Sequence, residues 1–120
     1  MTVSDNMRID MEQVLVRLGI LPHQIGYTYI LKGLVLCLEN SDHLRRITAG
    51  LYAAISAQSG ASISAVERGI RGAIERAWSA RVYNEMGDLF AAWVSRPNNG
   101  QFFAVLSSYL RFRWHGQGMN

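Results

Sequence analysis

The residues best suited to chemistry are arginines and glutamates that recur in one short stretch, at Glu67, Arg68, Arg71, Glu75 and Arg76. A guanidinium group is a planar fork of N–H donors, which fits the paired acceptors of guanine and the oxygens of phosphate. Glutamate can accept a hydrogen bond from the amino group of cytosine. Glu67 with Arg71 and Arg71 with Glu75 also have the i, i+4 spacing of pairs that simply support a helix. The stretch therefore suits nucleic-acid contact or a solvated helix face.

The residues before this stretch predict a helix-turn-helix. One helix closes near 55–56, and Gly60 supplies the turn because glycine adopts a positive φ without steric cost. Ser62 and Ser64 are both N-cap candidates for the next helix, and Ser64 with Glu67 has the form of a capping box. Two short helices with arginines on the second suit the major groove of DNA, although an ordinary helical corner has the same local pattern.

Length and charge narrow the possible functions. The chain has 120 residues, 49% of them hydrophobic, which suits one domain with a real core. Its net charge of +3 is unevenly placed, because 1–43 carries three basic and five acidic residues, whereas 44–120 carries nine arginines and four acidic residues. The basic excess lies on and after the predicted helix-turn-helix, which makes nucleic acid a reasonable partner.

Little in the sequence supports catalysis or a cofactor. His23, His43 and His115 are scattered, and their spacing resembles no metal site. Cys37 lies in the most apolar stretch, where we expect a small core residue. A single cysteine cannot form an intrachain disulfide, which fits a reducing cytoplasm, and no signal peptide or membrane span is visible. We therefore expect a cytoplasmic protein without enzyme activity, cofactor or metal.

The apolar residues recur with a helical period and predict about six helices in one all-α domain. The first helix has a stripe that starts at Met11, and Gly19 can end it. The second, about 24–39, is apolar on nearly every face and should be central. Ser41 is a good N-cap for the third. The buried stripe of that third helix is Leu44, Ile47, Leu51 and Ile55.

The fourth predicted helix, about 62–80, has distinct inner and outer faces. The inward set is Val66, Ile70, Ala73, Ile74, Ala77 and Trp78. The outward set is Ala65, Glu67, Arg68, Arg71, Gly72, Glu75 and Arg76. A fifth stripe is Tyr83, Met86, Leu89, Phe90, Trp93 and Val94. The loop 96–100 then offers asparagine caps for a last helix, which is marked by Phe102, Val105, Leu106 and Tyr109.

Several segments, in order, resemble one known family. The run 66–78 (VERGIRGAIERAW) is similar to the recognition helix of the C-terminal DNA-binding effector domain of the sporulation master response regulator, the stage 0 sporulation protein A family. The run 18–29 (LGILPHQIGYTY) resembles the segment between its first two helices, and 47–55 resembles its third helix. Leu89-Phe90 and Pro97-Asn98-Asn99 match its aromatic helix and its last cap. The resemblance covers roughly 11–113.

The resemblance implies a six-helix domain that reads short GC-containing boxes in double-stranded DNA, often as head-to-tail pairs on tandem sites. It divides the chain into an N-terminal flank, 1–10, a helical DNA-binding domain, 11–113, and a flexible tail, 114–120. Its expected partners are DNA, a second copy on tandem sites, and a full-length regulator or a separate receiver protein. No receiver domain precedes the segment in this sequence, so we expect a stand-alone transcription regulator.

Two substitutions depart from the family pattern. Ala65 stands where the family usually has a base-reading arginine, and alanine can touch a thymine methyl group but cannot contact guanine with two hydrogen bonds. Gly72 replaces a larger polar residue. Together with Gly69 it weakens helix propensity, by up to about 1 kcal/mol per glycine relative to alanine. These glycines either permit a closer approach to the DNA backbone or reflect relaxed selection.

Roles follow for individual side chains. Arg68, one turn into the helix, is our first choice for a base contact, together with Glu67 and Ala65. Glu67 serves equally well in a capping box and a pair with Arg71. The predicted phosphate contacts are Ser62, Ser64, Arg71, Arg76 and Arg81. The alternative function is a protein-interaction module that associates with or antagonises a full-length regulator.

Overall fold

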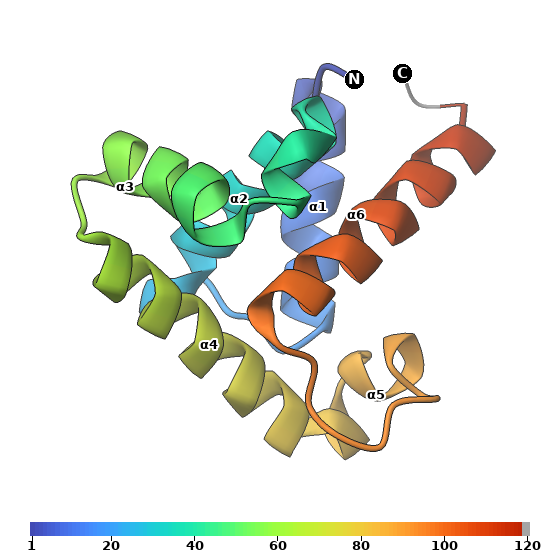
Figure 1. Cartoon of the computed structure of the whole chain (residues 1–120). Helices are drawn as coiled ribbons and strands as arrows, with labels where there is room; N and C mark the ends of the chain where they lie inside the picture. The colour runs from blue at the N-terminus through green and yellow to red at the C-terminus, as the bar shows by residue number, and fades with distance from the viewer. Residues whose placement is uncertain (119–120) are drawn as a thin grey trace.

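The computed structural model describes residues 1–118 of the chain. This range contains six α-helices and three short 3-10 or π turns, joined by loops (Figure 1). The α-helices are α1 (Asp5–Arg17), α2 (Ile25–Glu39), α3 (Ala53–Ser59), α4 (Ile63–Ser79), α5 (Met86–Leu89) and α6 (Asn99–Gly116). The turns are η1 (Ser41–Leu44), η2 (Ile47–Tyr52) and η3 (Arg81–Tyr83). No strand occurs in this range, so the predicted all-α fold is confirmed. No helix within it is long and apolar enough to cross a membrane.

The second helix is central, as its apolar composition predicts. α2 packs against α4, α6, α3 and η1, and Ile30, Leu34 and Cys37 are fully buried along it. A helix with apolar residues on every face can bury them only when other elements surround it. The last helix, α6, contributes five fully buried side chains to the hydrophobic core: Phe102, Phe103, Leu106, Leu110 and Trp114.

The first and last helices are longer than predicted. α1 begins at Asp5 rather than near Met11, because the Ser4 hydroxyl caps it by accepting a hydrogen bond from the Met7 backbone N–H at 3.2 Å. Met7 is fully buried, so part of the expected N-terminal flank belongs to the core. At the other end α6 continues to Gly116, which takes it into the expected tail, and 119–120 lie outside the described residues.

The third predicted helix is not continuous, and Ser41 is not its cap. Asn40 caps η1 instead, with its Oδ1 accepting from the Asp42 backbone N–H at 3.0 Å. Arg46 then adopts a non-helical conformation, and its carbonyl accepts from the Leu51 N–H, five residues on. The π turn inserts one extra residue before α3 begins. Leu51 and Ile55 of the predicted stripe are buried, whereas Leu44 and Ile47 are only partly buried.

The fifth predicted helix is also interrupted and shrinks to the single turn of α5. Asn84 is extended, and its side chain bonds the backbone in two directions, donating to the Ala77 carbonyl at 3.0 Å and accepting from the Met86 N–H at 2.9 Å. Only Met86 and Phe90 of the predicted stripe are fully buried. Tyr83 and Val94 are exposed, so their placement in a buried stripe is wrong.

Candidate nucleic-acid interface

The turn before α4 is fixed by backbone geometry and serine side chains. Gly60 ends α3 in the left-handed region, with φ of 78°, and its N–H donates to the Ser56 carbonyl at 2.9 Å. The Ser56 hydroxyl donates to the Ala61 carbonyl at 2.6 Å, and the Ser59 hydroxyl accepts from the Ala61 N–H. In Figure 1 this turn joins α3 and α4 at one edge of the molecule. The predicted pair of helices and the role of Gly60 are confirmed, but the first helix ends at Ser59 rather than near 55–56.

The N-cap of α4 is Ser62. Its hydroxyl accepts a hydrogen bond from the Ala65 N–H at 3.1 Å, and its backbone is extended. Ser64 lies inside the first turn instead, so the capping box predicted for Ser64 and Glu67 is wrong. Ser62 already occupies the capping position, and the Glu67 carboxylate points to Arg71. Both serines are exposed near the positive end of the helix dipole, where phosphate binds favourably.

The outward face of α4 presents Arg68 at its centre. Val66, Ile70, Ala73, Ile74 and Ala77 are buried. At 3.6 residues per turn, Arg68 lies on the side of the helix opposite to this set. It is exposed, and its guanidinium makes no hydrogen bond or ion pair with any residue between 1 and 118. The predicted separation of inner and outer faces is confirmed, except that Trp78 is only partly buried.

One flank of α4 borders a hollow of about 600 Å³, which we call the α2–α4 hollow. From α4 it is lined by Ala65, Arg68, Gly69, Gly72 and Arg76. From the start of α2 and the residues before it, it is lined by His23, Gln24 and Ile25. Ala65 and Arg68 therefore share one side of the helix, whereas Glu67, predicted with them as a base contact, lines a separate pocket on the other flank.

That other flank carries a chain of ion pairs. Arg71 Nη1 lies 2.6 Å from Glu67 Oε1, and Arg71 Nε lies 3.9 Å from Glu75 Oε1. Arg96, from the loop before α6, reaches the same Glu75 oxygen at 3.6 Å. Both predicted i, i+4 pairs are thus present. Because two carboxylates face Arg71, its charge is partly compensated, in contrast to the charge of Arg68.

The remaining predicted phosphate contacts, Arg76 and Arg81, differ in the interactions that they make within the protein. Arg76 is exposed and makes no ion pair within 1–118; its Nη1 lies 3.3 Å from the position that a Cβ on Gly72 would occupy. Arg81 donates from Nη1 to the Trp78 carbonyl at 3.0 Å, and its guanidinium lies over the Trp78 ring, 4.3 Å from the centroid. Arg81 therefore caps the C-terminal end of α4 by bonding a carbonyl of its last turn, where a cation also interacts favourably with the helix dipole.

The position of α4 depends on two glycines that the sequence analysis did not assign to packing. A Cβ on Gly26 would run into the carbonyl oxygen of Gly69, so the backbones of α2 and α4 are in direct contact. On the other helix, a Cβ on Gly69 would lie 2.9 Å from the Tyr29 ring. Gly69 therefore serves the helix crossing. The sequence did offer a signal for this contact, because each of the two long helices with an apolar stripe contains a glycine.

A buried amide also holds α4, and the sequence analysis missed it as well. Asn99, the first residue of α6, donates from Nδ2 to the Tyr52 hydroxyl at 2.9 Å and to the Glu67 carbonyl at 3.2 Å. Burial raises the pKa of Tyr52, so its hydroxyl stays protonated at neutral pH. The predicted asparagine cap of α6 is its neighbour Asn98. One asparagine thus begins the helix, and the next joins η2, α4 and α6.

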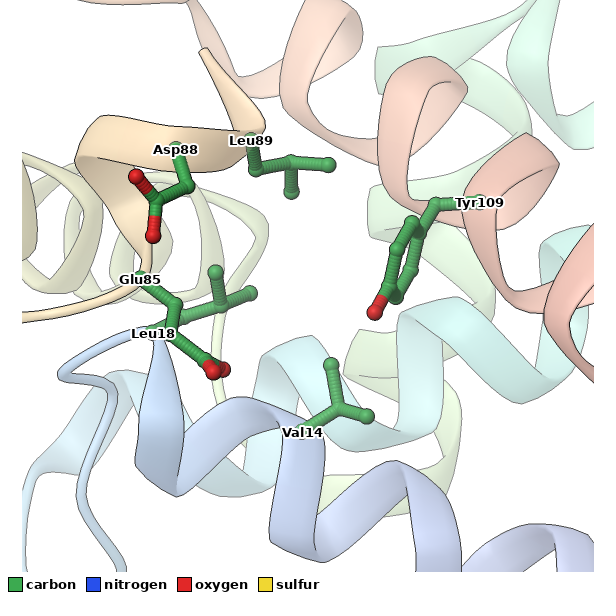
Figure 2. Close-up of a pocket in the computed structure, with 6 residues that line it drawn as sticks. All are labelled: Val14, Leu18, Glu85, Asp88, Leu89 and Tyr109. Atoms are coloured by element: carbon green, nitrogen blue, oxygen red, sulfur yellow. The ribbon is translucent and has the colours of Figure 1, made fainter. Parts of the chain in front are cut away.

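A second cavity, of about 310 Å³, lies between α1, α5 and α6 (Figure 2). Figure 2 shows the Tyr109 ring turned toward Val14 of α1, with the carboxylates of Glu85 and Asp88 on the opposite wall. The Glu85 carboxylate pairs with Arg17 at 3.4 Å, so its charge is partly compensated. None of the residues predicted to contact DNA lines this cavity.

The residues with potential metal or nucleophile chemistry do not assemble. Within 1–118 no group of three or more His, Cys, Asp or Glu side chains could hold a metal ion. Cys37 is fully buried, and desolvation raises the pKa of its thiol to about 12. The thiol is therefore protonated at neutral pH, as expected for a core residue.

Comparison with known families decides the assignment. The family model described as the sporulation initiation factor Spo0A C-terminal domain matches residues 11–110. The chain belongs to this family. The match contains the whole of α2, α3 and α4, and the resemblance in the sequence is thereby confirmed. Members of this family are DNA-binding effector domains of a sporulation response regulator, so the chain is a DNA-binding domain of transcription regulation.

Proposed function

We propose that the chain binds double-stranded DNA sequence-specifically by inserting α4 into the major groove, and that these 120 residues suffice for binding. In this proposal Arg68 contacts a base edge, with Ala65 and Glu67 beside it. The proposed phosphate contacts are Ser62, Ser64, Arg71, Arg76 and Arg81. The observation that carries the proposal is the exposed Arg68 guanidinium, which pairs with no residue in 1–118 and lies on a helix whose backbone is in contact with that of α2.

The site's rigidity and charge support this role. A recognition helix must be held firmly, because each good pair of hydrogen bonds to a base discriminates only about 1–3 kcal/mol. Contact of the Gly26 and Gly69 backbones and the bond from Asn99 to the Glu67 carbonyl hold α4 on two sides. The serine-capped N-terminus and Arg76 supply positive potential around Arg68 for the phosphates.

The test is fluorescence anisotropy on a duplex with two tandem GC-containing boxes of the family and on a scrambled duplex of equal composition. Both are titrated at low and near-physiological salt. Tighter binding to the boxes that persists at higher salt supports a sequence reader, and stepwise binding of two copies supports a dimer on tandem sites. Equal, salt-labile binding to both duplexes contradicts the proposal, unless unbiased site selection recovers a different box.

The second candidate function is association with a full-length regulator or a receiver protein. It is favoured by Val82 and Tyr83, whose relative exposures are 80% and 90% on η3, beyond the end of α4. Exposed apolar side chains of this size are typical of partner surfaces. Light scattering of the chain mixed with a full-length family regulator, without DNA, tests this role. A complex abolished by Tyr83→Ser supports it, and two unmixed species contradict it.

A further inference from the structure

Half of the residues that line the α2–α4 hollow carry no polar side-chain atom, and they lie beside Arg68. Ala65, Gly69 and Gly72 bring no polar side-chain atom to it. Ile25, the first residue of α2, is 75% exposed, and its Cγ2 lies 3.5 Å from the position of a Cβ on Gly69. The exposed part of the Ile25 side chain is therefore accessible to a molecule that enters the hollow.

The polar side chains that line the hollow are His23, Gln24, Arg68 and Arg76, and the Arg76 guanidinium lies over Gly72. The Oε1 atom of Gln24 already accepts a hydrogen bond from the Leu21 N–H at 3.3 Å. Arg68 and Arg76 stand along α4 without ion pairs to any residue in 1–118. A surface that combines apolar side chains with two arginines suits a polyanion that carries a small apolar group.

The major groove of DNA offers one such group. Thymine alone among the four bases presents a methyl group there, and alanine and other apolar side chains contact it. Because Ala65 and Gly69 are small, a base edge can approach this part of α4 closely. Arg68 and Arg76 then hold the neighbouring base pair and the backbone, since a guanidinium fits both guanine and phosphate.

We propose that the α2–α4 hollow seats the 5-methyl group of a thymine next to the base pair contacted by Arg68. Ile25 is then a specificity residue supplied by α2, outside the helix-turn-helix, and Ala65 is its partner on α4. This inference rests on the proposed binding of DNA by α4. It predicts that the preferred site of this chain has a thymine at a fixed position beside a guanine.

The test uses a duplex recovered by site selection with the full chain. Each thymine is replaced in turn by deoxyuridine, which removes the methyl group and keeps the base pair. At one thymine beside the guanine we expect the Kd to rise about fourfold, the effect of one buried methyl group. Substitutions at the other thymines should change the Kd by less than twofold.

Two variants separate the hollow from the rest of the surface. Ile25→Ala should bind the thymine and deoxyuridine duplexes with the same Kd, while its melting temperature stays at the wild-type value because Ile25 is exposed. Val82→Ala, which removes a similar exposed aliphatic side chain from η3, should keep the fourfold difference.

The outcomes are distinct for the two proposals. If the wild type prefers its selected duplex to a scrambled one but no deoxyuridine raises the Kd, the hollow does not seat a methyl group, although α4 still reads DNA. If Ile25→Ala keeps the fourfold difference, Ile25 is not the contact and the inference is also overturned. If selected and scrambled duplexes bind equally, the proposed function fails together with this inference.

Discussion

At the scale of single residues, identical side chains three positions apart have different surroundings. Arg68 has no carboxylate partner within 1–118, whereas Arg71 is bonded to Glu67 and faces Glu75. Spacing alone predicted both pairs of Arg71 and the exposure of Arg68. It could not decide between Ser62 and Ser64 as the cap, because both precede the apolar stripe and only the backbone conformation distinguishes them.

A single substitution can remove one of the two carboxylates that compensate the charge of Arg71. In Glu67→Gln the ion pair at 2.6 Å is lost, so the charge of Arg71 is less compensated and its proposed contact with phosphate becomes stronger. We expect tighter binding to the scrambled duplex, where no base contact of Glu67 is lost, and a slope of log K against log salt that is steeper by up to about 0.9. Anisotropy titrations at four salt concentrations measure this slope.

The matched control is Glu85→Gln, which changes the net charge equally. Glu85 pairs with Arg17, 3.4 Å away, and lines the cavity of Figure 2 rather than the face of α4. It should leave the slope unchanged. An equal increase in both variants would show that only overall charge matters, which contradicts a local role for Arg71.

At the scale of elements, long helices were predictable and interrupted ones were not. Continuous stripes identified α2 and α4 because a helix period of apolar residues must face a core. The breaks come from side chains that bond nearby backbone, at Asn40 and Asn84, and from the π turn after Arg46. Apolar spacing carries no information on these bonds. The third and fifth helices were therefore predicted as continuous, although the structure interrupts both.

The crossing of α2 and α4 leaves no room for a side chain. Gly26→Ala places a methyl group against the Gly69 carbonyl, so the two helices must move apart. We expect a loss of about 1–3 kcal/mol in the free energy of unfolding, as for other overpacked cores. Urea denaturation followed by circular dichroism measures this loss.

Gly116→Ala is the matched control, because apart from its own helix backbone and chain neighbours no atom of residues 1–118 lies within 4 Å of the added methyl group. In helical backbone near the end of α6 it should be neutral or stabilise by up to about 1 kcal/mol. Equal stability of Gly26→Ala and the wild type would mean that the two helices are not in backbone contact in solution.

At the scale of the whole molecule, α1 and α6 are joined by a charged cluster. Asp10 accepts from Arg113 at 2.7 and 2.9 Å and from the Trp114 indole N–H at 2.8 Å. Asp10 was predicted to lie in a flank and Trp114 in a tail, because residues about a hundred positions apart leave no periodic signal. Their hydrogen bond instead joins the first helix of the domain to the last.

This cluster makes stability depend on acid. The hydrogen bonds from Arg113 lower the pKa of Asp10 below its usual value of 3.8. A carboxylate whose pKa is lower in the folded state stabilises fully above the unfolded pKa and loses that contribution as the pH falls through the folded pKa. We expect Asp10→Asn to cost about 1–3 kcal/mol at pH 7 and progressively less below about pH 4.

Urea unfolding of both proteins at pH 7, 4 and 2.5 measures the difference. The exposed carboxylate Asp88, which forms no ion pair within 1–118, gives the control Asp88→Asn, whose cost at pH 7 should be small. A cost for Asp10→Asn that does not shrink in acid would exclude an ionised Asp10 as its source.

The central claim is that the exposed face of α4 reads bases through Arg68 and holds the backbone through Arg76. The most direct measurement compares Arg68→Ala and Arg76→Ala by anisotropy on the selected and scrambled duplexes over a range of salt. Arg68→Ala should lose about 1–3 kcal/mol on the selected duplex and little on the scrambled one. Arg76→Ala should weaken both equally and reduce the salt slope by about one. If Arg68→Ala leaves the preference for the selected duplex unchanged, α4 does not read DNA in the orientation described.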